Sequence, residues 1–109
     1  MLTREQLLDI AQTPLKPAKV VTPFGEVYVP RMTAKELAAF YDAIEKKPKG
    51  VELSLIMVDE FGTRLFAEKD AEQLERLPAA FTMPVSRDFR EANGLVPKDS
   101  APPADSPTG

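Results

Sequence analysis

The sequence predicts an α+β domain that is mainly helical, with a small N-terminal β-hairpin packed against about four to five short helices. Two valine-rich arms around a Pro-Phe-Gly turn predict the hairpin, and a capping box before an apolar stripe predicts a helix. The length of 109 residues fits a single globular domain over residues 1–96. The Pro-rich segment 97–109 contains no large apolar side chain, so we expect it to be a disordered tail.

A short helix is expected at the N-terminus. Thr3 can cap it, and Glu5 favours the positive end of its dipole. Its apolar face would carry Leu7, Ile10 and Ala11. Pro14 and Pro17 then keep the chain extended. Their spacing also fits a polyproline ligand, but a rigid connector is the favoured interpretation.

The hairpin is predicted from residues 19–21 and 26–29, which flank the motif Thr22-Pro23-Phe24-Gly25. Proline second and glycine fourth in that motif suit a type I turn. Alternation places Val27 and Val29 on one face of the second strand and Tyr28 on the other. Pro30 cannot donate to a ladder and ends the strand.

A second helix is predicted to begin after Thr33, which forms a capping box with Glu36. Its apolar stripe would consist of Leu37, Phe40, Tyr41 and Ile44. Lys46 and Lys47 suit its C-terminal end, and residues 48–50 are expected to stop it. The pattern of residues 51–58 fits either a helix or a strand.

The remaining chain predicts a turn at residues 59–62, an apolar anchor at residues 65–66, and two further helices. Asp70 is the expected cap of the first, which should run through Leu74 and Leu77. The last helix would open at Pro78 and end at Asn93-Gly94. Its expected apolar face is Phe81, Val85, Phe89 and Ala92, and Pro84 predicts a kink or a restart within it.

Composition excludes several classes of function. The chain has no Cys and no His, which removes disulfides, thiolate nucleophiles, imidazole bases and the usual zinc ligand sets. A net charge of −3 disfavours nucleic acid as a partner. Asp59, Glu60 and Thr63 could contribute to a hard cation site, but ordinary turn chemistry explains them better. We therefore predict no catalytic residue, cofactor or metal site, and no enzyme activity.

The longest purely apolar run, residues 55–58, is far shorter than the roughly 20 residues of a membrane span, and no signal-peptide pattern opens the chain. We therefore expect no membrane partner and a cytoplasmic location. Several large apolar residues also fall outside the helical stripes, and they either complete the core or form a surface that recognises another chain. The predicted partner-binding residues are Phe24, Tyr28, Met32, Phe40, Tyr41 and Phe61.

The order of these motifs resembles the tail assembly chaperones of long-tailed bacteriophages. The resemblance covers about residues 3–95 and rests on order and spacing, because each motif alone is a common cap, turn or stop. It is carried by the helix at residues 3–8, the hairpin at 23–29, the capped start at 32–37, the Val-Asp-Glu-x-Gly-x-x-Leu-Phe type of run at 58–66, Leu77-Pro78 and Asn93-Gly94-Leu95. Pro84 and the Pro-rich end depart from the family pattern.

The resemblance implies a non-enzymatic protein that binds the tape measure protein, keeps it soluble and helps to recruit tail tube subunits. It further implies self-association, a longer product made by frameshifting, action in the host cell cytoplasm and absence from the mature virion. Because the family is mainly helical, it favours a helix at residues 51–58. The alternative function is a small interaction adaptor or regulatory module of phage or bacterial origin.

Overall fold

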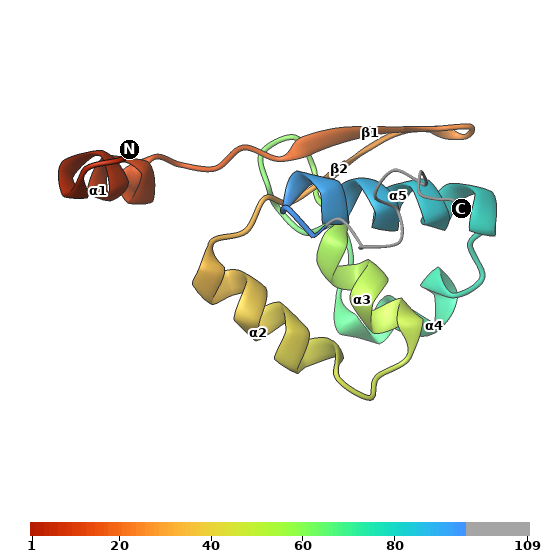
Figure 1. Cartoon of the computed structure of the whole chain (residues 1–109). Coiled ribbons are helices and arrows are strands. Elements are labelled where there is room, and N and C mark those ends of the chain that lie inside the picture. Colours follow the sequence, from red (N-terminus) through yellow and green to blue (C-terminus); the bar gives the residue numbers. More distant parts are fainter. Residues whose placement is uncertain (96–109) are drawn as a thin grey trace, which may run out of the picture.

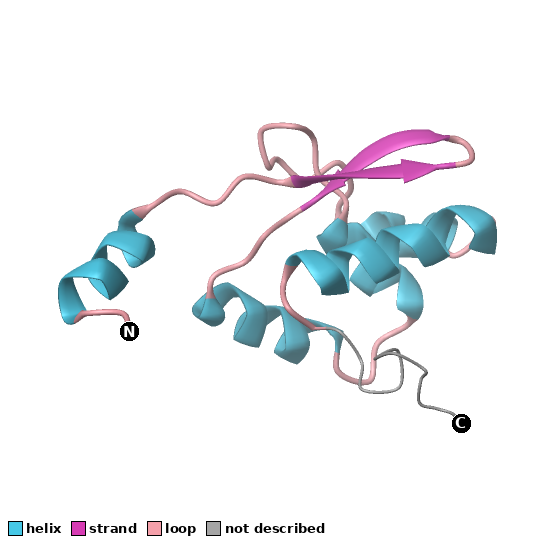
Figure 2. Ribbon diagram, turned by 45° about the horizontal axis from the view of Figure 1, so that its top comes forward, coloured by secondary structure: helices cyan, strands magenta, loops and turns pink. Residues whose placement is uncertain are grey.

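The structure, a computed structural model, describes residues 1–95, which form a β-hairpin and five α-helices. In chain order these are α1 (Arg4–Gln12), β1 (Ala18–Thr22), β2 (Gly25–Val29), α2 (Ala34–Ile44), α3 (Lys49–Ile56), α4 (Ala71–Leu74) and α5 (Ala79–Ala92). The hairpin lies across α5, with α3 on the opposite side of α5, and α1 stands apart from the rest (Figures 1 and 2). The predicted mainly helical α+β fold is confirmed. The predicted tail, 97–109, lies outside the described residues.

The hairpin has the predicted strands and faces. β1 and β2 pair antiparallel from Ala18 opposite Val29 to Thr22 opposite Gly25. In the turn, the Thr22 hydroxyl accepts a hydrogen bond from the Phe24 amide at 3.1 Å, and Gly25 takes a φ of 138°. Val27 and Val29 are buried while Tyr28 is half-buried, because alternate side chains point to opposite faces.

A single hydrophobic core joins the hairpin to the helices. The buried residues of the hairpin face α5, and Phe40 of α2 meets Phe89 of α5 with ring centroids 5.1 Å apart. The cluster consists of Val20, Val27, Val29, Phe40, Leu53, Ile56, Met57, Leu74, Val85 and Phe89. Both strands and every α-helix except α1 contribute to it.

The boundary between α2 and α3 differs from the prediction. α2 ends at Ile44, and Lys46 adopts a left-handed conformation with φ 57°. Pro48 then lies at the N-cap of α3, so residues 48–50 begin a helix instead of only stopping one. Proline suits this position because the first amides of a helix have no intrahelical acceptor. The expectation of a helix within residues 51–58 is confirmed, since α3 continues to Ile56.

Gly50 lets two helical segments come into close contact. A Cβ atom on Gly50 would collide with the backbone carbonyl of Ala71, the first residue of α4. The Gly50 amide also donates to a carboxylate oxygen of Glu75 at 3.0 Å. Gly50 therefore serves the packing of α3 against α4, which local sequence does not reveal.

Asp70 stabilises a turn, but not in the predicted way. Its carboxylate accepts a hydrogen bond from the Ala67 amide at 2.8 Å, and it makes no side-chain cap for α4. A short 3-10 helix, Glu68–Asp70, precedes α4. α4 itself ends at Leu74, so the predicted helix through Leu77 is too long.

α5 is one continuous helix through Pro84, so the predicted restart is wrong. Pro84 has no amide N–H, so the Ala80 carbonyl has no donor within the helix. Ala80 is exposed, and water can donate to its carbonyl instead. The predicted stop is confirmed: Gly94 has φ 73°, its amide donates to the Glu91 carbonyl, and the Leu95 amide donates to the Arg90 carbonyl. These two bonds form a Schellman motif, which satisfies the last carbonyls of α5.

Candidate functional site

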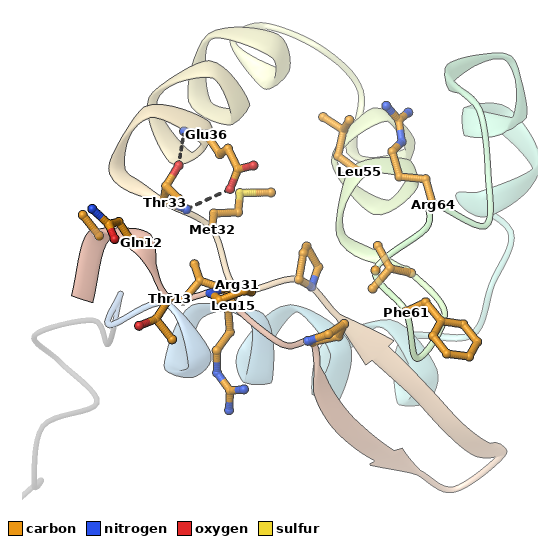
Figure 3. Close-up of a pocket in the computed structure, with 16 residues that line it drawn as sticks. Gln12, Thr13, Leu15, Arg31, Met32, Thr33, Glu36, Leu55, Phe61 and Arg64 are labelled. Atoms are coloured by element: carbon orange, nitrogen blue, oxygen red, sulfur yellow. Dashed lines mark hydrogen bonds between the residues drawn. The ribbon is translucent and has the colours of Figure 1, made fainter. Parts of the chain in front are cut away.

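A hollow of about 600 Å³ lies on the described surface and is here called the linker groove. Its lining comes from residues 11–17, which include the end of α1 and the linker, and from residues 30–36, which lead into α2. Leu55 and Val58, around the end of α3, and the loop at 61–64 complete it (Figure 3). Apolar side chains supply much of its lining, notably Leu15, Met32, Leu55, Val58 and Phe61. Charged side chains also line it, namely Arg31, Glu36 and Arg64.

Asn93, at the end of α5, fixes one wall of the linker groove. Its side-chain oxygen accepts from the Met32 amide at 2.7 Å, and its Nδ2 donates to the Pro30 carbonyl at 3.0 Å. The same nitrogen donates to the Phe89 carbonyl at 2.9 Å. One side chain therefore holds the chain before α2 against the last helix, across more than 60 residues of sequence.

Two further contacts shape the groove. Arg31 donates to the Lys16 carbonyl at 2.9 Å and so ties the linker to the opposite segment. At the start of α2, the Glu36 amide donates to the Thr33 hydroxyl at 3.1 Å, and the Thr33 amide donates to the Glu36 carboxylate at 2.9 Å (Figure 3). The predicted capping box is confirmed, and it engages the Glu36 carboxylate within α2.

The turn at residues 59–62 carries Phe61 beside the groove. The Asp59 carboxylate accepts from the amides of Phe61 and Thr63 at 2.8 and 2.9 Å, and Gly62 takes a φ of 90°. The Phe61 ring is 82% exposed as a result. Asp59 is thus engaged by the backbone of its own loop. Within residues 1–95, no group of three potential ligand side chains could hold a metal ion.

The helix α1 exposes its entire apolar face. It has the predicted cap, in which Thr3 accepts from the Gln6 amide and Gln6 accepts from the Thr3 amide. None of its residues is buried, and it stands at the end of the extended linker (Figure 1). The large apolar residues in α1 and on either side of it are each about half exposed, namely Leu2, Leu7, Leu8, Ile10 and Leu15.

The structure brings only some of the predicted partner-binding residues together. Met32 and Phe61 both line the linker groove. Tyr28 lies beside Phe61 in a second, shallower hollow that also includes Val58. The Val58 amide donates to the Tyr28 carbonyl at 2.9 Å, which holds this loop against β2.

The other three predicted residues lie elsewhere. Phe24 is 63% exposed at the hairpin tip. Its ring packs edge-to-face against the ring of Phe81, with the two ring centroids 6.3 Å apart. Tyr41 is half-exposed on α2 and does not line the groove. Phe40 is only 6% exposed and belongs to the core, which corrects its assignment to a binding surface. Its stripe position beside Tyr41 could not distinguish the buried ring from the exposed one.

Sequence reasoning missed Arg31, Leu55 and Arg64 as residues of a site. The groove exists because separate segments meet, and the only local signal was the apolar excess around Leu15 and Phe61.

Away from the groove, on α5, the hydrogen bond to Asp88 raises the pKa of Arg87 above its ordinary value.

Within residues 1–95, no helix is long and apolar enough to cross a membrane. A comparison of the chain with protein-family models, curated proteins and solved structures gives no match.

Proposed function

We propose that this protein is a phage tail assembly chaperone that binds the tape measure protein, keeps it soluble and helps to recruit tail tube subunits. The resemblance in motif order suggests this function, and the linker groove is the structural observation that supports it. An apolar groove with charged residues among its lining suits the apolar face of a helical polypeptide. The proposed place of action is the host cell cytoplasm.

The groove suits reversible binding. Its volume of about 600 Å³ accommodates a few side chains of a partner helix, which favours modest affinity at each contact. A chaperone of this kind must later release its partner to the tail tube subunits. Several weak contacts along a long partner serve that purpose better than one deep pocket.

Phe61 is the proposed anchor for the partner. Its ring is held outward by a loop that hydrogen-bonds to Asp59, so it is presented without local rearrangement. Met32 lines the same groove, and its flexible thioether adapts to irregular apolar surfaces. Phenylalanine is one of the aromatic residues that are enriched at protein interfaces.

Co-expression with the tape measure protein, whose gene the proposal places just downstream of this one, tests the proposal. We expect the tape measure protein to be soluble only when the chaperone is present, and Phe61→Ser to lower the soluble fraction several-fold. Met83→Ser is the matched control, because Met83 is 68% exposed on α5 and does not line the groove.

A tape measure protein that stays soluble without this chain would refute the chaperone function and favour the adaptor alternative. Equal effects of Phe61→Ser and Met83→Ser would refute the linker groove as the binding site.

A further inference from the structure

We propose that a groove along α5 is a second binding site, which takes an extended acidic segment of a protein other than the one assigned to the linker groove. This α5 groove has a volume of about 570 Å³ and lies between α5 and the start of α3. Its lining includes Lys49, Ala80, Met83, Ser86, Arg87 and Arg90. The two grooves have no described lining residue in common, so both can be occupied at once, and the proposal does not depend on the chaperone function.

The first observation is a hydroxyl group without a partner. Ser86 is 6% exposed, and its Oγ atom has no hydrogen-bond partner among the described residues. Buried polar side chains are hydrogen-bonded in most native structures, so an exception needs an explanation. Because no bond holds the hydroxyl in its present rotamer, a rotation about χ1 can turn it toward a ligand in the α5 groove. A ligand with polar groups supplies the partner that the hydroxyl lacks.

The second observation is a carbonyl group without a donor in its own helix. Pro84 lies inside α5 and has no amide N–H, which leaves the Ala80 carbonyl unpaired within the helix. Both residues line the α5 groove. An extended polypeptide presents free amides that can donate to this carbonyl, whereas the amides of a helix are already bonded. The groove therefore suits an extended segment better than a helix.

The third observation is the sign of the charges. Three cationic side chains line the α5 groove, and no described carboxylate does. Lys49 already pairs with Glu52 at 3.2 Å. Arg87 likewise pairs with Asp88 at 2.9 Å. Arg90 is exposed and forms no ion pair within residues 1–95, so its guanidinium is available to a carboxylate of the partner, which it can bind through two parallel hydrogen bonds.

The fourth observation is an exposed apolar side chain beside these polar groups. Met83 is 68% exposed and lines the α5 groove. It lies three residues before Ser86 and seven before Arg90, so the three side chains follow one face of α5. Its flexible thioether adapts to irregular apolar groups. The groove therefore matches a segment in which an apolar side chain stands next to a carboxylate.

Titration of the isotope-labelled full-length chain with a defined peptide, followed by two-dimensional NMR, tests the proposal. The probe is the hexapeptide Leu-Glu-Leu-Asp-Leu-Glu with both ends blocked, which is too short to form a stable helix. Its matched control is the uncharged peptide Leu-Gln-Leu-Asn-Leu-Gln. We expect saturable shifts of amides in residues 79–90 with a dissociation constant below about 1 mM, and no comparable shifts at residues 30–33 and 61–64.

Three outcomes of this titration would overturn the proposal. The first is the absence of shifts in residues 79–90 up to about 5 mM acidic peptide. The second is equal binding of the uncharged peptide, which would show that carboxylates are not recognised. The third is the same set of shifts with inorganic phosphate alone, which would show a site for a simple anion and not for a peptide.

Two variants identify the groups that bind the probe. Arg90→Gln should raise the dissociation constant at least about tenfold, because it removes a charged hydrogen-bond donor. Arg76→Gln is the matched control, since Arg76 is an exposed arginine that does not line the α5 groove. Equal effects of the two variants would contradict the proposal.

Ser86→Ala should raise the dissociation constant about fivefold without lowering the melting temperature, because the hydroxyl has no partner in the free protein. A lower melting temperature would show that this hydroxyl serves the fold and would overturn its assignment to the site. The chaperone proposal would survive all of these results, because it depends on the linker groove and is measured by co-expression.

Discussion

Replacement of Asn93 by Ala tests how the wall of the linker groove is held. The substitution removes the acceptor for the Met32 amide and the donor for the Pro30 carbonyl, while α5 can still end at Gly94. Two hydrogen bonds between half-buried groups contribute about 1 kcal/mol each. We therefore expect the free energy of unfolding to fall by about 2 kcal/mol, and the melting temperature to fall by about 8–16 °C for a domain of this size.

Chemical denaturation followed by circular dichroism measures the change. Asn93→Asp should cost at least as much as Asn93→Ala, because a carboxylate oxygen in place of Nδ2 would face the Pro30 and Phe89 carbonyl oxygens and would put a negative charge at the C-terminal end of α5. Glu91→Ala is the control, since Glu91 is exposed on the same turn of α5. Hydrogen exchange should also show faster exchange of the Met32 amide in Asn93→Ala. A loss below about 0.5 kcal/mol with unchanged Met32 protection would refute the role given to Asn93.

Two other substitutions separate packing from conformation. Gly50→Ala should destabilise the fold by about 3 kcal/mol, because its Cβ would collide with the Ala71 backbone. Gly94→Ala should cost only about 1 kcal/mol, because the only obstacle there is the positive φ of residue 94. Equal losses of stability in thermal denaturation would contradict this difference. Phe24→Ser should cost about 1 kcal/mol, since the ring is mostly exposed and loses only its contact with Phe81. A loss above about 3 kcal/mol in the same assay would place Phe24 in the core.

Local chemistry explains which parts of the fold could be predicted. The box between Thr33 and Glu36 involves residues three apart, and it forms as expected. The faces of β2 follow from strict alternation around Tyr28, and the stop at Asn93-Gly94 follows from tolerance of a positive φ. Each of these depends on neighbours in sequence, so the pattern alone was sufficient.

Tertiary contacts explain what could not be predicted. Gly50 reads as a helix stop, yet its role depends on Ala71, which lies 21 residues later. Phe40 and Tyr41 occupy the same apolar stripe, and only the packing against Phe89 determines which ring is buried. Pro84 was expected to interrupt α5, but the carbonyl it leaves without a donor belongs to the exposed Ala80.

The candidate site shows the same division. An excess of apolar residues outside the stripes drew attention to Met32 and Phe61, and both line the linker groove. The turn motif correctly placed Phe24 at the hairpin tip, but the excess could not show that Phe24 lies outside the linker groove and that Leu55 lines it. A cavity between separate segments has no signature in any one of them.

The position of Asn93 near the end of the described chain has a consequence for biosynthesis. A ribosome makes the linker and the start of α2 early, but the side chain that holds them together is added more than 60 residues later. Nascent chains fold only as their contact partners emerge. The linker groove therefore acquires its final shape only after Asn93 has emerged from the ribosome, and a partner cannot engage the finished surface before that point.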